Sequence, residues 1–244
     1  MRQFGLIGYP LGHSFSKRYF TEKFQELGLS DHLYETFPIE SIEGLAPLLD
    51  THPDLKGLNV TIPHKEAVIP FLQVQSPVVK AIGACNCIHI KEGKLWGYNT
   101  DVIGFQRSLQ SSFPELPEKA LILGTGGASK AVRYVLETLN ISFQFVSRKK
   151  MESTITYDEL DAETLREHRL IVNTTPLGMQ PAISEAPPIP YEFIGEEHCL
   201  FDLIYNPATT VFLEKGRKRG AQIQNGLDML VIQAEESWKI WNTV

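Results

Sequence analysis

Few cysteines and no long apolar run limit what this chain can be. The three cysteines, Cys85, Cys87 and Cys199, form an odd set without metal-ligand spacing, so reduced thiols in a cytoplasmic protein fit best. No apolar run approaches the roughly 18 residues of a membrane span. Glycine and proline interrupt the apolar stretch 4–12, and we interpret it as a strand and loop rather than a signal peptide.

Metal-binding motifs and positive charge are also scarce. The seven histidines show neither an HxxxH nor an HExxH pattern, so no metal site is expected. A net charge of −6 disfavours nucleic acid and anionic membranes as partners, although a local basic patch can still recognise a phosphate. With 43% apolar and 21% charged residues, the 244-residue chain has the composition of a soluble globular protein of one large or two small domains.

Short apolar segments alternate with helical patterns along the whole chain. Such alternation predicts an α/β fold built on parallel sheets. The expected strands are residues 2–7, 33–37, 55–62, 120–123, 143–146, 170–172 and 200–203. Residues 88–90 and 95–96 flank Glu92-Gly93, which predicts a β-hairpin turn.

Helical spacing predicts helices between these strands. One expected helix has Phe20, Phe24 and Leu27 on its apolar face and ends at Gly28. A second is expected over 42–49, after Ser41, and a third over 128–139. A last helix ends the chain, and its apolar face is expected to hold Leu227, Leu230, Val231, Ala234, Trp238 and Trp241. The loop 111–117, which contains two prolines, marks a boundary between two α/β cycles.

A glycine-rich segment, Gly124-Thr125-Gly126-Gly127-Ala128, lies between an expected strand and an expected helix. This order brings backbone N–H groups and the positive end of a helix dipole to a place where a pyrophosphate can bind. Ser129 replaces the third glycine of the GxGxxG pattern, so a tight structural turn is the alternative.

The strand after this helix ends in Val146-Ser147-Arg148-Lys149-Lys150. NAD-binding proteins usually carry an acid here to accept hydrogen bonds from the ribose 2′-hydroxyl. This chain has no carboxylate at that point and has a guanidinium, which can pair bidentately with a phosphate. The pattern favours NADP, and a solvated basic turn is the alternative for Lys149 and Lys150.

Lys65 and Asp101 lie in two unusually polar settings, Asn59 to Lys65 and Gly97 to Asp101. Amide, hydroxyl, ammonium and carboxylate groups crowd there around short apolar strands. Both precede the glycine-rich turn, and this order suggests a catalytic pair from one domain that acts on a nucleotide held by the next.

Eight motifs resemble those of shikimate dehydrogenases, in the family's order and over essentially the whole chain. They are His13-Ser14-Phe15-Ser16, Asn59-Val60-Thr61-Ile62-Pro63-His64-Lys65, Gly83-Ala84-Cys85-Asn86, Gly97-Tyr98-Asn99-Thr100-Asp101, Gly124-Thr125-Gly126-Gly127-Ala128, Asn173-Thr174-Thr175-Pro176-Leu177-Gly178-Met179, Asp202-Leu203-Ile204-Tyr205-Asn206-Pro207 and Asn225-Gly226-Leu227-Asp228-Met229-Leu230. The family reduces 3-dehydroshikimate to shikimate with NADPH in aromatic amino-acid biosynthesis.

The resemblance implies a domain division and a set of roles. Residues 1–101 with 227–244 are expected to bind substrate, and residues 102–226 to form a Rossmann-like NADP-binding domain, with the last helix returning to the first domain. Lys65 and Asp101 are expected to flank the reacting oxygen, with Lys65 transferring the proton. The expected substrate-binding residues are Ser14, Ser16, Asn59, Thr61, Asn86, Tyr205 and Gln233. The expected cofactor-binding residues are Gly124, Gly126, Gly127, Ala128, Ser147, Arg148, Thr174, Leu203 and Gly226.

The residue chemistry fits a polyhydroxylated ring carboxylate. Ser14 and Ser16 lie two apart, so in an extended segment both hydroxyls point the same way and can hold the carboxylate. Capping the following helix is the alternative for this pair, and Asp101 can likewise cap the helix after it. Lys17, Cys87 and Ser147 depart from the residues usual in the family; a small buried apolar residue is the plain interpretation of Cys87.

Two rival functions remain open at this point. The nearest is an enzyme of the same fold that also accepts quinate or prefers NAD. The other is a catalytically silent ligand-binding relative, which would most simply have lost Lys65 or Asp101, and both are present. The sequence is compatible with a monomer or a homodimer in the cytoplasm.

Overall fold

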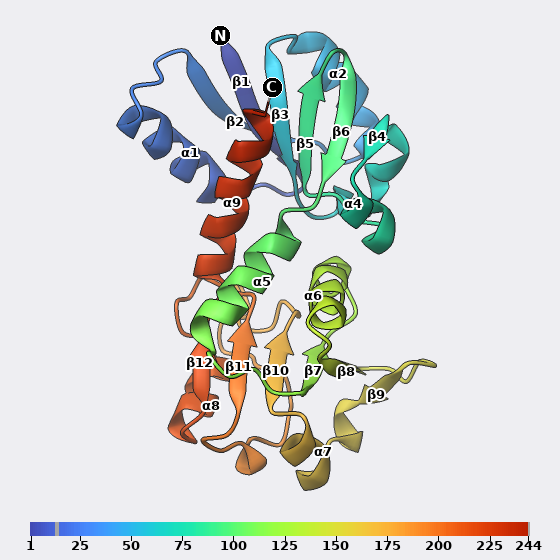
Figure 1. Cartoon of the computed structure of the whole chain (residues 1–244), viewed down its shortest axis with the longest axis vertical. Helices are drawn as coiled ribbons and strands as arrows, with labels where there is room; N and C mark the ends of the chain where they lie inside the picture. The colour runs from blue at the N-terminus through green and yellow to red at the C-terminus, as the bar shows by residue number, and fades with distance from the viewer. Residues whose placement is uncertain (13–14, 244) are drawn as a thin grey trace. The chain divides into compact units, whose positions relative to one another are not determined.

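The computed structural model describes residues 1–12 and 15–243. They form two compact units: Met1–Thr100 with Ala234–Val244 is unit 1, and Asp101–Gln233 is unit 2 (Figure 1). Unit 1 thus includes the last helix only from Ala234, whereas the predicted boundary lies at residue 227. The expected functional domains, 1–101 with 227–244 and 102–226, stay a prediction.

Unit 1 is built on a six-stranded mixed sheet in the order β2-β1-β3-β5-β6-β4. The strands are β1 (Arg2–Gly8), β2 (His32–Pro38), β3 (Leu55–Val60), β4 (Val74–Gln75), β5 (Cys87–Lys91) and β6 (Lys94–Tyr98). The expected hairpin is present, because β5 and β6 are antiparallel and both Glu92 and Gly93 have positive φ. β3 ends at Val60 rather than Ile62, and the chain then turns into a short helix.

The helices of unit 1 are short apart from the first. They are α1 (Phe15–Glu26), α2 (Leu45–Thr51), α3 (His64–Ala67) and α4 (Pro77–Ile82), with 3₁₀ turns η1 (Ile42–Gly44) and η2 (Ile69–Phe71). The helix expected over 42–49 is therefore divided into η1 and α2. Leu27 lies beyond the end of α1 and is 55% exposed, so it is not part of the core face that Phe20 and Phe24 form.

Unit 2 has a wholly parallel sheet in the order β12-β11-β10-β7-β8-β9. Its strands are β7 (Lys119–Leu123), β8 (Ser142–Ser147), β9 (Thr154–Thr156), β10 (Leu170–Asn173), β11 (Cys199–Asp202) and β12 (Gln222–Gln224). Its helices are α5 (Asp101–Ser112), α6 (Gly127–Thr138), α7 (Ala162–Glu167) and α8 (Val211–Lys218), with 3₁₀ turns η3 (Tyr157–Glu159) and η4 (Tyr191–Phe193). The strand order reverses at β7, and ligands of such sheets bind at this point, outside the carboxyl ends of the strands.

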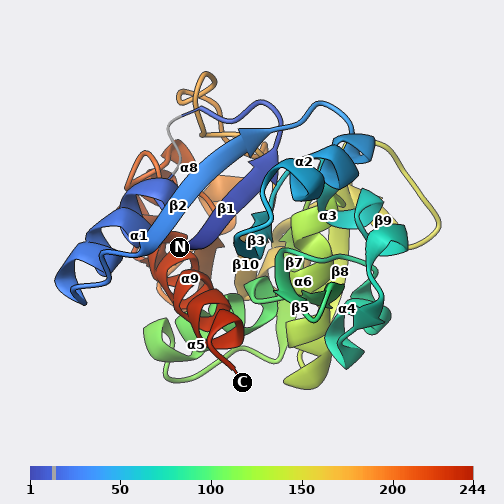
Figure 2. The same cartoon turned by 90° about the horizontal axis from the view of Figure 1, so that it is seen from above.

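The last helix, α9 (Leu227–Trp241), begins in unit 2 and ends in unit 1. Its end lies beside β1 in both views (Figures 1 and 2). The Trp241 indole stacks on Phe4 with 4.9 Å between ring centroids, and its Nε1 donates a 2.9 Å hydrogen bond to the carbonyl oxygen of Ile88. A Cβ atom on Gly57 would lie 2.2 Å from the same Nε1, so the indole packs directly on the backbone of β3.

The buried face of α9 differs from the apolar face that the sequence predicted. Its buried residues are Met229, Gln233, Ala234, Ser237 and Trp241. Leu227, expected on this face, is 41% exposed. Two polar residues, Gln233 and Ser237, therefore occupy positions that a search for apolar spacing does not find.

None of the helices described by the structure is long and apolar enough to span a membrane. All three cysteines are buried and form no disulfide with one another, so they act as small core residues.

Replacing Gly57 by alanine is expected to destabilise the protein by about 1–3 kcal/mol, because the added methyl group overpacks the Trp241 indole. Urea unfolding would measure the free-energy change. Gly12→Ala is the matched control, since a Cβ there meets nothing within 4 Å, and its effect should stay within about 0.5 kcal/mol. Equal stability of the two variants would mean that α9 does not need close contact with β3.

Candidate active site

The backbone of unit 1 holds Lys65 beside the segment that carries Asn86. Lys65 lies in α3, directly after β3, and its side chain is half-buried. The neighbouring His64 is buried and donates from Nε2 to the carbonyl oxygen of Ile39 at 2.7 Å. The carbonyl oxygen of Lys65 accepts a 2.7 Å bond from the amide of Cys85. These two bonds tie α3 to the backbone at Ile39 and at Cys85.

Asn86 is held by Thr100, the last residue of unit 1 before α5. Its Oδ1 accepts from the Thr100 amide at 2.7 Å, and its Nδ2 donates to the Thr100 hydroxyl at 3.0 Å. Both side chains are buried. The amide orientation of Asn86 is therefore determined by two bonds to one residue.

Asn59 joins the same polar cluster from β3. Its Oδ1 accepts from the Tyr34 hydroxyl at 2.8 Å, and its Nδ2 donates to the Ser237 hydroxyl at 3.0 Å and to the Asn86 carbonyl oxygen at 3.4 Å. Thr61 follows with a half-buried side chain, and its amide bonds to the carbonyl of Ile7 at 2.9 Å. The structure thus brings Asn59 and Asn86 together within unit 1.

Ser16 does not lie in an extended segment. α1 begins at Phe15, so Ser16 is buried in its first turn, and the expected extended geometry does not hold at that residue. A hydrogen bond links Ser16 to the Tyr34 hydroxyl, so Ser16 continues the cluster at Asn59. Ser14 lies outside the described residues.

The second catalytic candidate and the remaining substrate-binding candidates belong to unit 2. Asp101 is the first residue of α5, one position earlier than the expected helix start. A negative carboxylate is stabilised there by the positive end of the helix dipole. Gln233 is buried on α9, and its Nε2 donates to the carbonyl oxygen of Leu230 at 3.0 Å. Tyr205 is half-buried in the loop after β11.

The glycine-rich turn connects β7 with α6. Gly124 has φ of +100°, Gly126 is extended, and Gly127 and Ala128 begin the 12-residue helix. Ser129, which replaces the third glycine, is buried and donates from Oγ to the Gly126 carbonyl oxygen at 2.7 Å. The hydroxyl satisfies a turn carbonyl, and backbone N–H groups at a helix start suit a pyrophosphate.

Three further cofactor candidates meet at the carboxyl ends of β7, β10 and β11. The Thr174 hydroxyl donates to the Leu123 carbonyl oxygen at 2.7 Å, and the Leu203 amide bonds to the Asn173 carbonyl at 3.1 Å. A Cβ on Gly226 would lie 2.1 Å from the Leu203 carbonyl oxygen, so a glycine is required there. Residues far apart in sequence thus line the edge where the strand order reverses.

A buried carboxylate organises the loops at this edge. Asp202 accepts hydrogen bonds from Asn173 Nδ2 at 3.0 Å, from the Ile204 amide at 3.0 Å and from the Thr210 hydroxyl at 2.6 Å. Burial raises the pKa of Asp202 to about 6, and the three donors only partly offset that rise. Asn173 Oδ1 in turn accepts from the amide and hydroxyl of Thr175.

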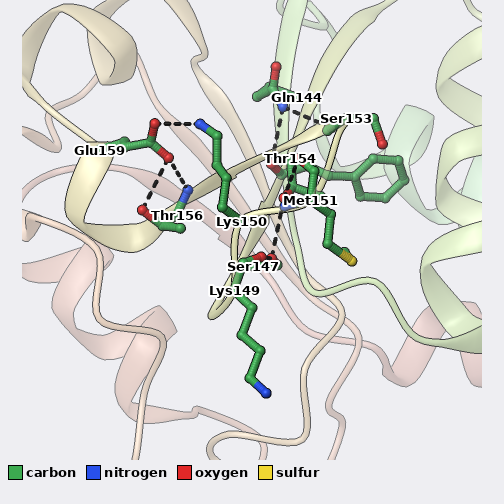
Figure 3. A network of polar contacts seen from close by, with 10 residues as sticks. Gln144, Ser147, Lys149, Lys150, Met151, Ser153, Thr154, Thr156 and Glu159 are labelled. Atoms are coloured by element: carbon green, nitrogen blue, oxygen red, sulfur yellow. Dashed lines mark hydrogen bonds and ion pairs between the residues drawn. The ribbon is translucent and has the colours of Figure 1, made fainter.

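The loop after β8 is closed by its own polar groups (Figure 3). The Ser147 hydroxyl donates to the Lys149 carbonyl oxygen, and the Met151 amide donates to Thr154 Oγ1 at 2.9 Å. Lys150 pairs with Glu159, and the same carboxylate caps η3 through Thr156. Figure 3 shows the Lys149 side chain pointing away from this network.

Arg148 and Lys149 are exposed, and neither has an ion-pair partner within residues 1–12 and 15–243. The two lysines, which the sequence treats alike, therefore differ: Lys150 is engaged by an acid and Lys149 is not. Arg148 and Lys149 thus lie just after β8, at the position where proteins of this fold bind the adenosine ribose or its phosphate.

Sequence reasoning missed several residues that shape the site. Tyr34 and Ser237 carry no motif, and only their contacts reveal them. Thr100, Asn173 and Asp202 belong to motifs shared with the family, and this membership could have marked them as site residues. Their hydrogen-bond partners could not be predicted from the sequence.

A mixed α/β unit with a buried amide cluster, followed by a parallel sheet with a glycine-rich turn and two exposed cations, is the arrangement expected of a dinucleotide-dependent oxidoreductase. The family model for the shikimate dehydrogenase substrate binding domain matches residues 6–88. The chain belongs to the shikimate dehydrogenase family, and the predicted family and α/β fold class are confirmed.

Individual relatives are similar over nearly their full length. The chain is 39% identical to shikimate dehydrogenase (NADP(+)) of Methanococcus maripaludis, over 97% of this chain and 90% of the relative. A crystal structure of shikimate 5-dehydrogenase from Thermus thermophilus with NADP(H) and shikimate is 32% identical, with a TM-score of 0.87 and coverage of 100% and 94%. Quinate dehydrogenase from Corynebacterium glutamicum with NAD is 25% identical, with a TM-score of 0.85 and coverage of 100% and 94%.

Asp202 should make stability fall as pH rises. Its folded pKa of about 6 lies above the ordinary 3.8, so the stabilisation is fully present below about pH 4 and is lost as pH rises through 6. Asp202→Asn cannot ionise. Urea unfolding at pH 4.5 and 7.5 should therefore show the wild type losing about 2 kcal/mol more than the variant. Parallel pH profiles would mean that Asp202 ionises at its ordinary pKa.

Proposed function

We propose that this chain catalyses the NADPH-dependent, reversible reduction of 3-dehydroshikimate to shikimate, a step of aromatic amino-acid biosynthesis. The observation that carries the proposal is the fixed cluster of Asn59, Asn86 and Thr100 in unit 1, close in the fold to the backbone of Lys65. A ring with several hydroxyls needs such amides and hydroxyls. Family membership, with relatives named for this reaction and for NADP(+), supports the same reaction.

Lys65 and Asp101 are the proposed catalytic residues. Bound NADPH would supply a hydride to the carbonyl carbon of the substrate. Lys65 would donate a proton to the carbonyl oxygen, which becomes the hydroxyl. Asp101 would accept a hydrogen bond from the Lys65 ammonium group and so keep it pointed at that oxygen. In the reverse direction Lys65 accepts the hydroxyl proton. The two bonds that fix α3 support this role, because proton transfer requires a positioned group.

The substrate ring would be held by neutral donors. Ser14, Ser16 and Tyr205 are proposed to bind the carboxylate, and Asn59, Thr61, Asn86 and Gln233 to bind the ring hydroxyls. Both N–H groups of the Asn59 amide are already bonded within unit 1, so Asn59 would meet a hydroxyl through its oxygen.

NADP would be held by the glycine-rich turn and by the loop after β8. Gly124, Gly126, Gly127 and Ala128 would bind the pyrophosphate, with Thr174, Leu203 and Gly226 on the same edge of the sheet. Ser147 would shape the loop, and Arg148 would bind the 2′-phosphate. Lys149 would assist Arg148, since Lys150 is held by Glu159.

The likeness to a quinate dehydrogenase with NAD keeps quinate as a second candidate substrate. The exposed Arg148 favours NADP over NAD, because a guanidinium pairs with a phosphate. A silent ligand-binding relative is disfavoured because Lys65 and Asp101 are both present. We further propose a cytoplasmic protein, monomeric or homodimeric, that binds no nucleic acid or membrane.

Lys65→Ala should lower kcat on the order of 10²–10⁴-fold while changing the dissociation constant for shikimate little, because a proton-transfer group acts mainly in the transition state. Steady-state absorbance at the nicotinamide band and calorimetric titration with shikimate measure the two quantities. Glu66→Ala, on the exposed side of α3, serves as the control. Near wild-type turnover in Lys65→Ala would remove Lys65 from the mechanism.

Arg148→Ala should weaken NADP⁺ binding about tenfold or more relative to NAD⁺, since charge-assisted bonds contribute roughly 1.5–3 kcal/mol. Lys149→Ala should shift the same ratio in the same direction by a smaller factor. Lys150→Ala is the matched control, because its ammonium group already pairs with Glu159. Calorimetric dissociation constants for both cofactors give the ratios. Equal weakening of NADP⁺ and NAD⁺ by Arg148→Ala would assign Arg148 to the adenine pocket or the fold.

A further inference from the structure

Ser237 on α9 lies at the centre of the amide cluster of unit 1. Its hydroxyl accepts a 3.0 Å hydrogen bond from Asn59 Nδ2 and lies 3.2 Å from the Thr100 hydroxyl. It is fully buried, as is Thr100, and Asn59 is 5% exposed. One hydroxyl from the C-terminal helix therefore connects β3 with the end of the β6 segment.

The bond to Ser237 decides how the Asn59 amide points. An amide side chain has one acceptor and one donor end, and a flip exchanges them. Tyr34 donates to the oxygen end and Ser237 accepts from the nitrogen end, so the two contacts favour the same orientation. Without the hydroxyl, one buried N–H of Asn59 loses its partner, and the other keeps the long 3.4 Å contact to the Asn86 carbonyl.

Ser237 also reaches Asn86 through Thr100. The Thr100 hydroxyl accepts from Asn86 Nδ2 at 3.0 Å and shares a hydrogen bond with Ser237. A buried hydroxyl is costly unless it is hydrogen-bonded, and Ser237 lies on a helix face that otherwise packs Ala234 and Trp241 into the core. Its contacts with Asn59 and Thr100 offset the cost of burying the hydroxyl at this position.

We propose that Ser237 is a positioning residue for substrate binding, which orients Asn59 directly and Asn86 through Thr100. The proposal rests on the proposed function, in which the two asparagines bind ring hydroxyls. Ser237 itself need not contact the substrate. Because α9 is anchored by Trp241 one turn later, the hydroxyl has a fixed location from which to act.

Ser237→Ala should raise the dissociation constant and KM for shikimate about tenfold, since a buried donor left without its partner misplaces the amide. The dissociation constant for NADP⁺ should change less than twofold. Ser108→Ala is the matched control: Ser108 is a buried helical serine whose hydroxyl has no hydrogen-bond partner among residues 1–12 and 15–243, so its loss should leave both constants unchanged. Ser237→Cys, which fills the same space with a weak acceptor, gives a second variant if the alanine form unfolds, and should also weaken shikimate binding.

A double-mutant cycle separates positioning from a general loss of stability. In an Asn59→Ala background, Ser237→Ala should add much less than its effect in the wild type, because it acts through the missing amide. Full additivity, or wild-type shikimate binding by both Ser237 variants, would overturn the proposal while leaving the proposed function intact. A wild-type protein that binds NADP⁺ but does not bind shikimate in the calorimeter would overturn both.

Discussion

The anchoring of α9 in unit 1 is the interaction on which the buried polar cluster of that unit depends. The Trp241 indole bonds to the Ile88 carbonyl and packs on Gly57, so two neighbouring strands fix the end of the helix. A helix fixed at one end places its earlier residues at intervals of one turn. Ser237 therefore meets Asn59 and Thr100, and Gln233 lies one further turn back.

Buried polar groups set the geometry in both units, for the same physical reason. A polar atom removed from water must find a partner, and the partners fix its orientation. In unit 1 the partners form the chain from Tyr34 through Asn59 and Ser237 to Thr100 and Asn86. In unit 2 the carboxylate of Asp202 ties the loops after β10 and β11 together and keeps its pKa raised by burial.

The accuracy of the sequence-based predictions varied with how local their causes are. The hairpin at Glu92-Gly93 and the glycine-rich turn were predicted because residues next to one another in sequence decide them. The extended geometry expected around Ser16 does not hold, because α1 begins at Phe15 and places Ser16 in its first turn. The distinction between Lys149 and Lys150 required Glu159, which approaches only after the chain has turned through β9.

The sequence by itself determined the family, the α/β alternation and the residue types available for chemistry, since these depend on motifs and short-range periodicity. It also supplied the absence of an acid after β8, which favours NADP. Only the tertiary structure decided which polar groups meet. Ser237 is 178 residues from Asn59 in sequence, and no local pattern distinguishes it from a solvent-facing helix serine. Its role is fixed by packing, because burial of α9 removes water and brings the Ser237 hydroxyl within hydrogen-bond distance of Asn59 and Thr100.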